Sequence, residues 1–250
     1  MKIVLLGFGG WISNPLYGQT SLLVLNDNSG EYILLDAGEG VLRNMFECGF
    51  SEIRKLKAVV ITHSHGDHVL GIPTLVQFAK TVKSKIVIVG LRETIDAVVQ
   101  ILKAVSVSNY ECCIEPVAVS PGDVLEVGGF RVRFAEVEHT IPGLAVRVED
   151  SGSGRCLVYT GDTSYSEQIV RLSRDCSVLL HEASFLESES TLAKSLGHST
   201  LSDCLRTAVE ARNRFVIPLH FGLAEVKIDI DSLPQDITIL YPSKCLSIDI

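Results

Sequence analysis

Short apolar runs that end in polar or glycine-rich turns recur along the chain. Runs of four to eight such residues, rich in β-branched side chains, are typical of buried strands. We expect strands at 2–6, 20–25, 31–35, 58–61, 86–89, 124–127, 130–137, 144–148, 156–160, 178–180 and 215–219. Apolar spacing of three or four predicts helices near 40–48, 69–80, 92–104, 165–174 and 201–212. Alternating strands and helices favour an α/β fold.

Two local signals refine this pattern. Thr200 and Asp203 have the spacing of a capping pair at the start of the helix at 201–212. Pro218 lies inside the last apolar run, where a missing N–H predicts a sheet edge or a bulge. The turn at 7–10 contains three glycines, but no helix pattern follows it, so a phosphate-binding loop is not favoured there.

Composition narrows the class of protein. The chain has 250 residues, 46% of them hydrophobic, and no linker or low-complexity tract, so we expect one domain over residues 1–250. A net charge of −8 argues against a surface built throughout to hold nucleic acid. No run of eighteen apolar residues predicts a membrane span, and glycines interrupt the apolar start too early for a signal peptide.

The seven cysteines are scattered and have no C-x-x-C spacing. We interpret them as reduced, mostly buried thiols in a reducing compartment. A soluble cytoplasmic protein with no membrane partner is therefore the expectation.

Four metal-binding side chains follow the strand at 58–61 within six positions: His63, His65, Asp67 and His68. Imidazole and carboxylate groups bind divalent transition metals. If the turn stays extended, His63 and His65 project one way and Asp67 and His68 another, so one loop can serve two ions. The alternative is a polar turn with solvated histidines, but histidine-rich tracts more often bind metal.

Most of the other histidines also follow predicted strands, at positions 139, 181 and 220, and so does Asp162. Active sites of open sheets collect at such strand ends. Taken alone, His139 is a loop histidine, Asp162 a turn residue and His220 a buried histidine at a strand end. Together they supply about three ligands for each of two ions, with one shared carboxylate. For His181 we favour a structural role.

The motifs resemble those of the metallo-β-lactamase superfamily and, within it, the ribonuclease Z family of tRNA 3′-processing endonucleases. The resemblance covers almost the whole chain and is carried by the segments 35–40, 62–73, 159–163, 181–185 and 197–200. It implies a four-layer αββα sandwich, with a dinuclear metal site at one edge of the two sheets.

The same resemblance implies roles for the site residues. His63, His65 and His139 are expected on one metal, and Asp67, His68 and His220 on the other, with Asp162 as the bridge. Glu182 is expected to keep the His198 imidazole protonated, so that it assists the leaving oxygen. Asp36 would orient a ligand histidine, although a turn aspartate before a glycine needs no such explanation. Asp67, His198 and Glu182 are the residues that we expect to take part in catalysis.

The implied cofactors are two divalent ions, most simply Zn, with Fe or Mn as alternatives. A hydroxide bridging two such ions is a nucleophile at neutral pH. Two departures from ribonuclease Z affect the substrate. The family's tRNA-binding arm lies between the equivalents of His139 and Asp162, which here are only 23 positions apart (139 to 162). The segment 50–57 also lacks the proline-basic pattern that is linked to reading the tRNA 3′ end.

We therefore expect a dinuclear metal-dependent hydrolase that cleaves phosphodiester bonds in a small molecule or an RNA 3′ end. The first alternative is a true tRNA 3′-endonuclease whose substrate is held by a partner subunit, since the family forms homodimers. The second is hydrolysis of a thioester or lactam, against which the Glu182–His198 pair argues. A non-enzymatic binding module would need a decayed site, and no ligand position is lost.

Overall fold

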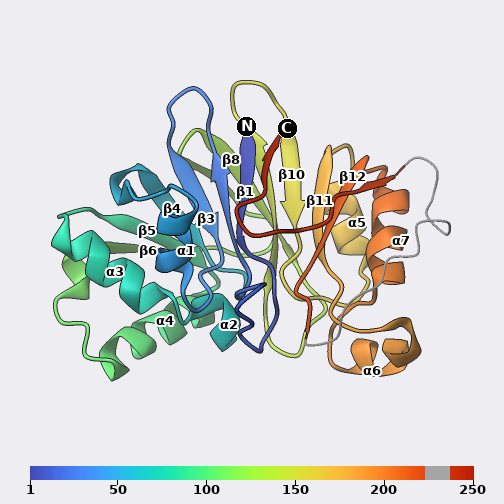
Figure 1. The fold of residues 1–250 in the computed structure, drawn as a ribbon, viewed down its shortest axis with the longest axis horizontal. Helices are drawn as coiled ribbons and strands as arrows, with labels where there is room; N and C mark the ends of the chain where they lie inside the picture. The colour runs from blue at the N-terminus through green and yellow to red at the C-terminus, as the bar shows by residue number, and fades with distance from the viewer. Residues whose placement is uncertain (223–236) are drawn as a thin grey trace.

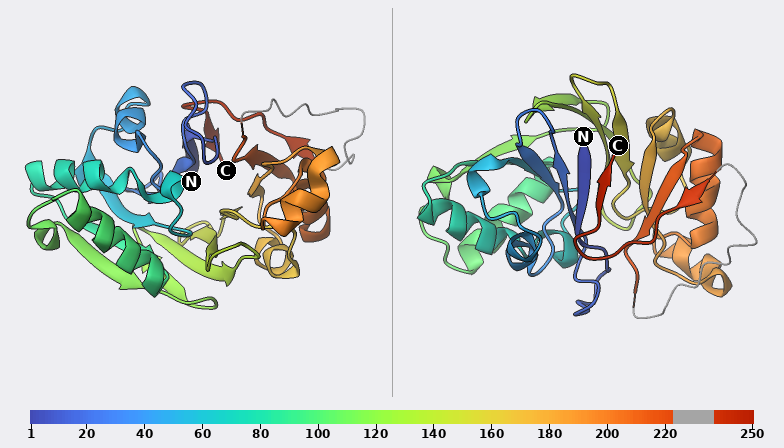
Figure 2. Two further views of the ribbon diagram at one scale, coloured as in Figure 1. Left: turned by 90° about the horizontal axis from the view of Figure 1, so that it is seen from below. Right: turned by 45° about the horizontal axis from the view of Figure 1, so that its top comes forward.

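Two seven-stranded sheets face each other, with helices on both outer sides (Figures 1 and 2). The computed structural model describes residues 1–222 and 237–250. The strand order of the first sheet is β14 (Ser247–Asp249), β1 (Lys2–Gly7), β2 (Ser21–Leu25), β3 (Tyr32–Leu35), β4 (Leu56–Val60), β5 (Ile86–Gly90), β6 (Ile114–Ala118). That of the second is β13 (Thr238–Ile239), β12 (Phe215–Leu219), β11 (Val178–Glu182), β10 (Cys156–Tyr159), β9 (Leu144–Asp150), β8 (Phe130–Glu136), β7 (Val124–Val127).

Both sheets are mixed, and each has a parallel and an antiparallel half. In the first, β3 to β6 pair in parallel, whereas β14, β1, β2 and β3 pair antiparallel. In the second, β10 to β13 pair in parallel, whereas β7 to β10 pair antiparallel. Parallel strands run in one direction, so the segments that follow them gather at one edge of the sheet.

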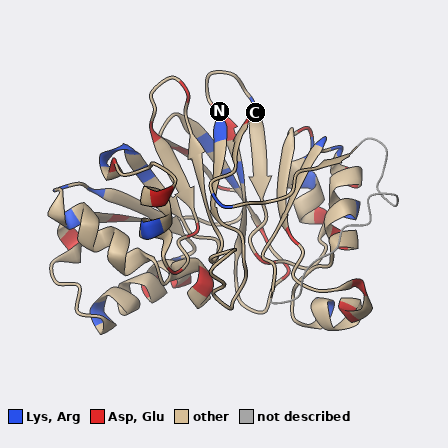
Figure 3. Ribbon diagram, in the orientation of Figure 1, with Lys and Arg blue, Asp and Glu red and all other residues tan. Residues whose placement is uncertain are grey.

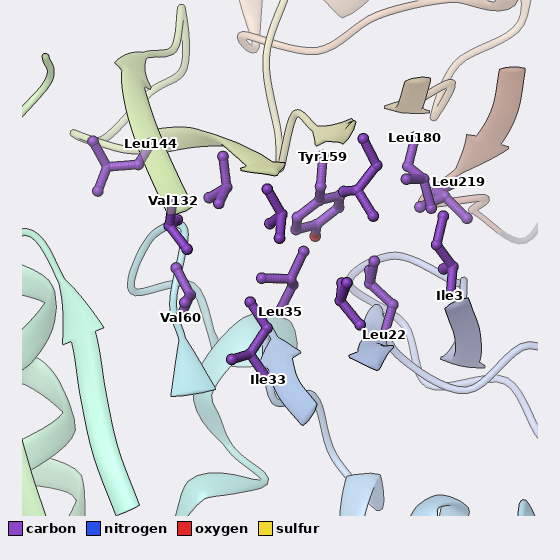
Figure 4. Packing of buried hydrophobic residues seen from close by; sticks show 14 of the residues in the cluster. Ile3, Leu22, Ile33, Leu35, Val60, Val132, Leu144, Tyr159, Leu180 and Leu219 are labelled. Atoms are coloured by element: carbon purple, nitrogen blue, oxygen red, sulfur yellow. The ribbon is translucent and has the colours of Figure 1, made fainter. Parts of the chain in front are cut away.

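The core lies between the sheets. Ile33 and Leu35 of β3 point into it, while Tyr32 and Leu34 point to the helices on the other side. Figure 4 shows inward side chains from both sheets meeting there, with the Tyr159 ring among them. Because both faces of the central strands are buried, the sequence shows unbroken apolar runs and not an alternating pattern.

Helices cover the outer faces. The first sheet is covered by α1 (Val41–Glu47), α3 (Ile72–Thr81) and α4 (Arg92–Ala104), and the second by α5 (Glu167–Ser173) and α7 (Leu201–Ala211). Short helices lie at the connections: η1 (Ile53–Lys55), α2 (Gly66–Val69), η2 (Tyr110–Cys112), η3 (Glu187–Glu189), α6 (Ser190–Ser195). The predicted capping box of Thr200 and Asp203 begins α7. The predicted αββα sandwich is therefore confirmed.

Three strands were not predicted, for two reasons. The segment that forms β6 is mostly exposed, contains Pro116 and lies at the edge of its sheet, so its apolar signal is weak. The other two, β13 and β14, have two and three residues and pair with distant segments. The helix predicted at 69–80 corresponds to α3, which begins three residues later, and the short helix α2 before it was not predicted. Pro218 lies beyond the part of β12 that pairs with β13.

The cysteine prediction is wrong for four of the seven residues. Cys48 is bonded to Cys245 and Cys156 to Cys176, with Cα–Cα distances of 5.2 and 5.0 Å. The first pair forms because α1 packs on β1 and the C-terminal segment returns to the same strand, a tertiary contact across 197 positions. The remaining thiols are free: Cys112, Cys113, Cys204. A reducing compartment therefore does not follow from the cysteines.

Within residues 1–222 and 237–250, no helix has the length and apolar character that crossing a bilayer requires.

Candidate metal centre

Four loops meet at one edge of the two sheets. They follow β4, β8, β10 and β12, and between them they carry the predicted ligands. Figure 1 shows this edge at the lower end of the molecule, where α2 lies between the two sheets. The structure brings all seven predicted ligand residues together there, although they span positions 63 to 220 of the chain.

The first group consists of His63, His65, His139 and Asp162. The Nδ1 atom of His65 lies 3.1 Å from Nε2 of His63 and 3.2 Å from Nε2 of His139. The Asp162 carboxylate lies 3.7 Å from His63 and 4.0 Å from His139. Three ring nitrogens and a carboxylate oxygen thus converge, as in a site with three histidines and one acidic ligand.

The second group consists of Asp67, His68, His220 and, again, Asp162. Nε2 of His220 lies 3.1 Å from Asp67 and 3.2 Å from Asp162. Nε2 of His68 lies 3.5 Å from Asp67 and 3.4 Å from Asp162. All four side chains are buried, and two buried carboxylates are costly unless a cation or hydrogen-bond donors compensate them.

Hydrogen bonds fix the tautomers of four of these histidines. Nδ1 of His68 donates to Asp36 at 2.6 Å, and Nδ1 of His139 to the carbonyl of Gly197 at 2.8 Å. Thr62 donates its hydroxyl proton to Asp36, so its oxygen accepts from Nδ1 of His63 at 3.0 Å. In the neutral form of each ring the lone pair is then on Nε2, the atom that faces the group of predicted ligands.

Ser184 fixes the fourth ring. Its hydroxyl donates to Glu182 at 2.6 Å, and Nδ1 of His220 lies 2.8 Å from the same oxygen. A hydroxyl that has given its proton to a carboxylate can only accept, so Nδ1 of His220 is the donor. Nε2 of His220 is therefore left facing Asp67 and Asp162, where it donates to Asp67 at 3.1 Å when the ring is protonated and can bind a cation when the ring is neutral.

Within the part of the chain that the structure describes, two buried atoms in the centre have no hydrogen-bond partner: Nε2 of His68 and Oδ1 of Asp162. Unpaired polar atoms in a protein interior are costly, and they indicate a partner such as an ion. These two atoms are 3.4 Å apart and belong to the second group. The donor set, the tautomers and the two unpaired atoms fit a divalent metal ion.

The two groups differ in the direction in which their surroundings shift the histidine pKa values. Burial, together with the charge that His68 carries when protonated, holds the pKa of His63 well below its usual value. Burial likewise lowers the pKa of His65 and of His139, so these three rings are neutral and ready to bind metal at pH 7. In the second group, burial opposes protonation of His68, but Asp162 and Asp36 outweigh it and raise its pKa well above the usual value. The carboxylates of Asp162 and Asp36 therefore stabilise a positive charge in the second group.

Asp36 holds residues around the centre in place through hydrogen bonds to its carboxylate. Its carboxylate accepts four hydrogen bonds, from the Thr62 N–H and hydroxyl, from His68 and from the Tyr159 hydroxyl at 2.7 Å. Its backbone is left-handed, with a φ of 55°, which an aspartate adopts more readily than most residues. Asp36 thus holds the ring of His68, a predicted ligand, and its supporting role toward a metal stays a prediction.

The Glu182–His198 pair lies beside the second group. Nδ1 of His198 is 2.9 Å from Oε1 of Glu182, whose carboxylate also accepts from the N–H groups of Thr163 and Ser199. Burial lowers the pKa of His198, but the hydrogen bond and charge of Glu182 outweigh it, so the pKa is raised. By contrast, the His181 ring is fully buried, and its Nδ1 lies 2.7 Å from the backbone carbonyl of Glu182. Among the described residues its Nε2 has no hydrogen-bond partner and the ring belongs to no metal-binding group, so its structural role stays a prediction.

A cavity of about 430 Å³ opens over the centre. Its wall includes Trp11 and Leu70 as well as Asp162, His198 and His220. The Trp11 ring lies 5.9 Å from both of these histidines and stacks on Phe185. The opening is therefore polar on the ligand side and apolar on the side of Trp11.

Several residues of the site had no role in the sequence prediction: Gly10, Trp11, Tyr159, Ser184. A Cβ atom at Gly10 would lie 3.0 Å from the His220 ring, so the glycine lets the backbone pass close to this ligand. The proximity of Ser184 to Glu182 in the chain was a usable signal, as was the presence of the single tryptophan next to the glycine-rich turn. The contact of Tyr159 with Asp36 joins residues 123 positions apart, and no local pattern predicts it.

Comparison with known proteins identifies the class that this fold and site define. Residues 31–221 match the model of the Beta-lactamase superfamily domain. The chain therefore belongs to the β-lactamase superfamily and is a hydrolase of the metallo-β-lactamase fold.

Individual relatives and solved structures show which members of the superfamily this chain resembles. Ribonuclease Z of Methanosarcina acetivorans is 27% identical, with 94% of this chain and 92% of the relative covered. The probable metallo-hydrolase YhfI of Bacillus subtilis is 29% identical, with 84% and 83% covered. Among solved structures, human tRNase Z, short form, superposes with a TM-score of 0.83 at 22% identity, over 100% of this chain and 99% of that one. The resemblance to ribonuclease Z is confirmed.

Proposed function

We propose that this protein is a dinuclear metal-dependent phosphodiesterase of the ribonuclease Z type. The observation that carries the proposal is the position of Asp162, whose carboxylate belongs to both ligand groups. One carboxylate shared by two groups of three further ligands is the arrangement that two adjacent ions require. Relatives named ribonuclease Z and metallo-hydrolase support the same reaction class.

The proposed ligands follow the two groups. His63, His65 and His139 hold one ion and Asp67, His68 and His220 the other, with Asp162 between them. When bound, two divalent ions neutralise charge on a phosphoryl group and lower the pKa of water. The protein's part is to fix the rings through their Nδ1 contacts, so that the ligand atoms need no rearrangement.

Proton transfer to the leaving oxygen is assigned to His198. Its Nδ1 is held by Glu182, and the raised pKa keeps the ring protonated near neutral pH. The protonated ring also lines the cavity over the centre, where a substrate would lie. A histidinium in this position is a general acid for an alkoxide leaving group.

For the substrate, we propose a phosphodiester that needs no tRNA-binding arm. Between His139 and Asp162 the chain forms only β9, a turn and β10. Lysine and arginine segments are interspersed with acidic ones in the view of Figure 3, and the net charge is −8. Processing of a tRNA 3′ end is the second candidate, favoured by the likeness to human tRNase Z.

One assay tests the function and separates the two candidates. The metal-loaded protein is given bis(p-nitrophenyl) phosphate in one reaction and a 3′-extended precursor tRNA in another. We expect turnover of the diester and intact tRNA, whereas cleavage after the discriminator base would establish the second candidate. Activity on neither substrate, with a thioester or lactam hydrolysed instead, would refute the proposal. Asp67→Ala is the matched inactive control.

The proposal also covers the identity of the metal, the domain organisation, the oligomeric state and the location of the protein. We propose zinc as the metal, because histidine and carboxylate ligands suit it, with iron and manganese as alternatives. Metal analysis of protein purified without added ions distinguishes them. We also propose one domain, a homodimer and a location in the cytoplasm. Light scattering tests the dimer and cell fractionation the location.

A further inference from the structure

A second hollow adjoins the metal centre. It has a volume of about 320 Å³ and lies where α6 and α7 meet the segment that follows Asp162. Figure 1 shows α6 at the same lower end of the molecule as α2. His198 lines both this hollow and the cavity over the centre, so the two are neighbouring parts of one site.

The shared histidine determines which part of a substrate would reach the hollow. In hydrolysis, an oxygen from water forms the new bond to phosphorus, and the bond to the leaving oxygen breaks. That oxygen takes a proton from His198, so the leaving group lies next to the ring. The same ring lines the second hollow, whose lining does not include Trp11.

The lining is polar and carries two cations. Lys194 lies in the last turn of α6 and is exposed, and no ion pair or hydrogen bond involves its ammonium in the described ranges 1–222 and 237–250. Ser190 and Thr191 add hydroxyl groups beside it. An unpaired ammonium among hydroxyls is suited to a phosphate group.

Arg206 is held in place on the opposite wall. Its Nε donates to Glu210 at 2.9 Å, and its guanidinium lies 3.7 Å from the centre of the Tyr165 ring. Glu210 also accepts from the Tyr165 hydroxyl, which fixes both side chains. A cation whose position is already fixed loses little side-chain entropy when an anion binds.

One acidic residue, Asp203, also lines the hollow. Its carboxylate accepts from the N–H and hydroxyl of Thr200 at the start of α7, so it serves a structural purpose. Lys194 and Arg206 counted against Asp203 leave the lining with an excess of one positive charge, and His198 adds another when it is protonated. Because Arg206 is already paired with Glu210, Lys194 is the cation that is open to an anion.

We propose that this hollow is a leaving-group subsite that binds a second phosphate of the substrate through Lys194. The proposal rests on the phosphodiesterase function above and specifies its substrate: a diester whose leaving nucleoside is itself phosphorylated. Lys194 is then a specificity-determining residue, and it takes no part in the chemical step.

Three dinucleotides test this with the metal-loaded protein. ApA has one diester, pApA has an added phosphate on its 5′ nucleoside, and ApAp has one on its 3′ nucleoside. Hydrolysis of ApA releases one nucleoside without a phosphate, and this nucleoside is the leaving group. One of the last two dinucleotides carries its added phosphate on that nucleoside. We expect kcat/KM for that isomer to exceed the value for ApA about tenfold, and the other isomer to match ApA.

Lys194→Gln should remove this preference and leave ApA hydrolysis unchanged. Lys103→Gln is the matched control, because Lys103 is an exposed lysine in the last turn of α4, on the far side of the first sheet. The control should behave like the wild type. Equal rates for the two isomers, or a preference that survives in Lys194→Gln, would overturn the proposal.

Failure to cleave any dinucleotide would refute the proposed function but would not test the phosphate subsite. A binding measurement tests the subsite in that case. Adenosine 3′,5′-bisphosphate should bind the metal-loaded protein more tightly than either adenosine monophosphate. Lys194→Gln should weaken the bisphosphate about fivefold and leave the tighter-binding monophosphate unaffected. No difference between the bisphosphate and the monophosphates would show that the hollow holds no second phosphate.

Discussion

The hydroxyl of Tyr159 connects the second sheet to the support of the metal centre in the first. Replacing Tyr159 by Phe removes only the oxygen that donates to Asp36 at 2.7 Å. The ring is 2% exposed in the core between the sheets, so Phe fills the same space and creates no cavity. Any loss of stability is then due to the hydrogen bond.

The expected magnitude follows from the acceptor. A hydrogen bond to a charged group contributes about 1.5–3 kcal/mol, and one between neutral groups about 0.5–1.5 kcal/mol. Asp36 keeps three other donors, which favours the lower part of the first range, about 2 kcal/mol. For a chain of this size, that corresponds to a fall in Tm of about 4–8 °C.

The assay is thermal unfolding of the metal-free protein, because bound metal would add its own stabilisation. Tyr32→Phe is the matched control: its ring is also 2% exposed, but its hydroxyl donates to the backbone carbonyl of Glu52 at 2.8 Å. We expect Tyr159→Phe to lower Tm about twice as far as Tyr32→Phe. Equal shifts, or no coupling with Asp36→Asn in a double-mutant cycle, would refute the assigned contact.

Three further predictions concern the centre and the thiols. Asp36→Asn should weaken metal binding about 10- to 100-fold, measured by competition with a chromogenic chelator, because His68 loses its carboxylate partner; unchanged affinity would contradict this. The raised pKa of His198 means that activity is present below this pKa and lost as pH rises through it. Glu182→Gln should therefore move the alkaline limb of the kcat/KM profile to lower pH, and an unmoved limb would exclude His198 as the acid. Alkylation of denatured, unreduced protein should modify three of the seven cysteines, and mass spectrometry showing seven would exclude both disulfides.

The sequence predicted those features that local pattern controls. Central strands such as β4 are buried on both faces, so their apolar runs are unmistakable, and the residues that follow them fall at the edge of a sheet. That geometry explains why predicted ligands as distant as His63 and His220 could be placed in one site. The prediction of a single domain stays a prediction.

The sequence analysis did not predict features that form only when distant parts of the chain pack together. The Cys48–Cys245 bond requires β14 to return to β1, and β14 has only three residues with no apolar run of its own. The contact between Tyr159 and Asp36 requires the two sheets to pack first. In both cases the partners are more than 100 positions apart, and their pairing is a property of the assembled layers.

The hydrogen bond from Tyr159 to Asp36 also has a consequence for how this sequence can change over generations. The ligand groups draw on both sheets, so a substitution in the core between them shifts one set of ligand atoms against the other. Apart from α2, which carries Asp67 and His68, and the turn at Gly197, which holds His139, the helical outer layers contain no predicted ligand or ligand contact described above. Sequence drift should therefore be tolerated on the outer layers long before it is tolerated between the sheets, and selection for catalysis will act as selection on packing.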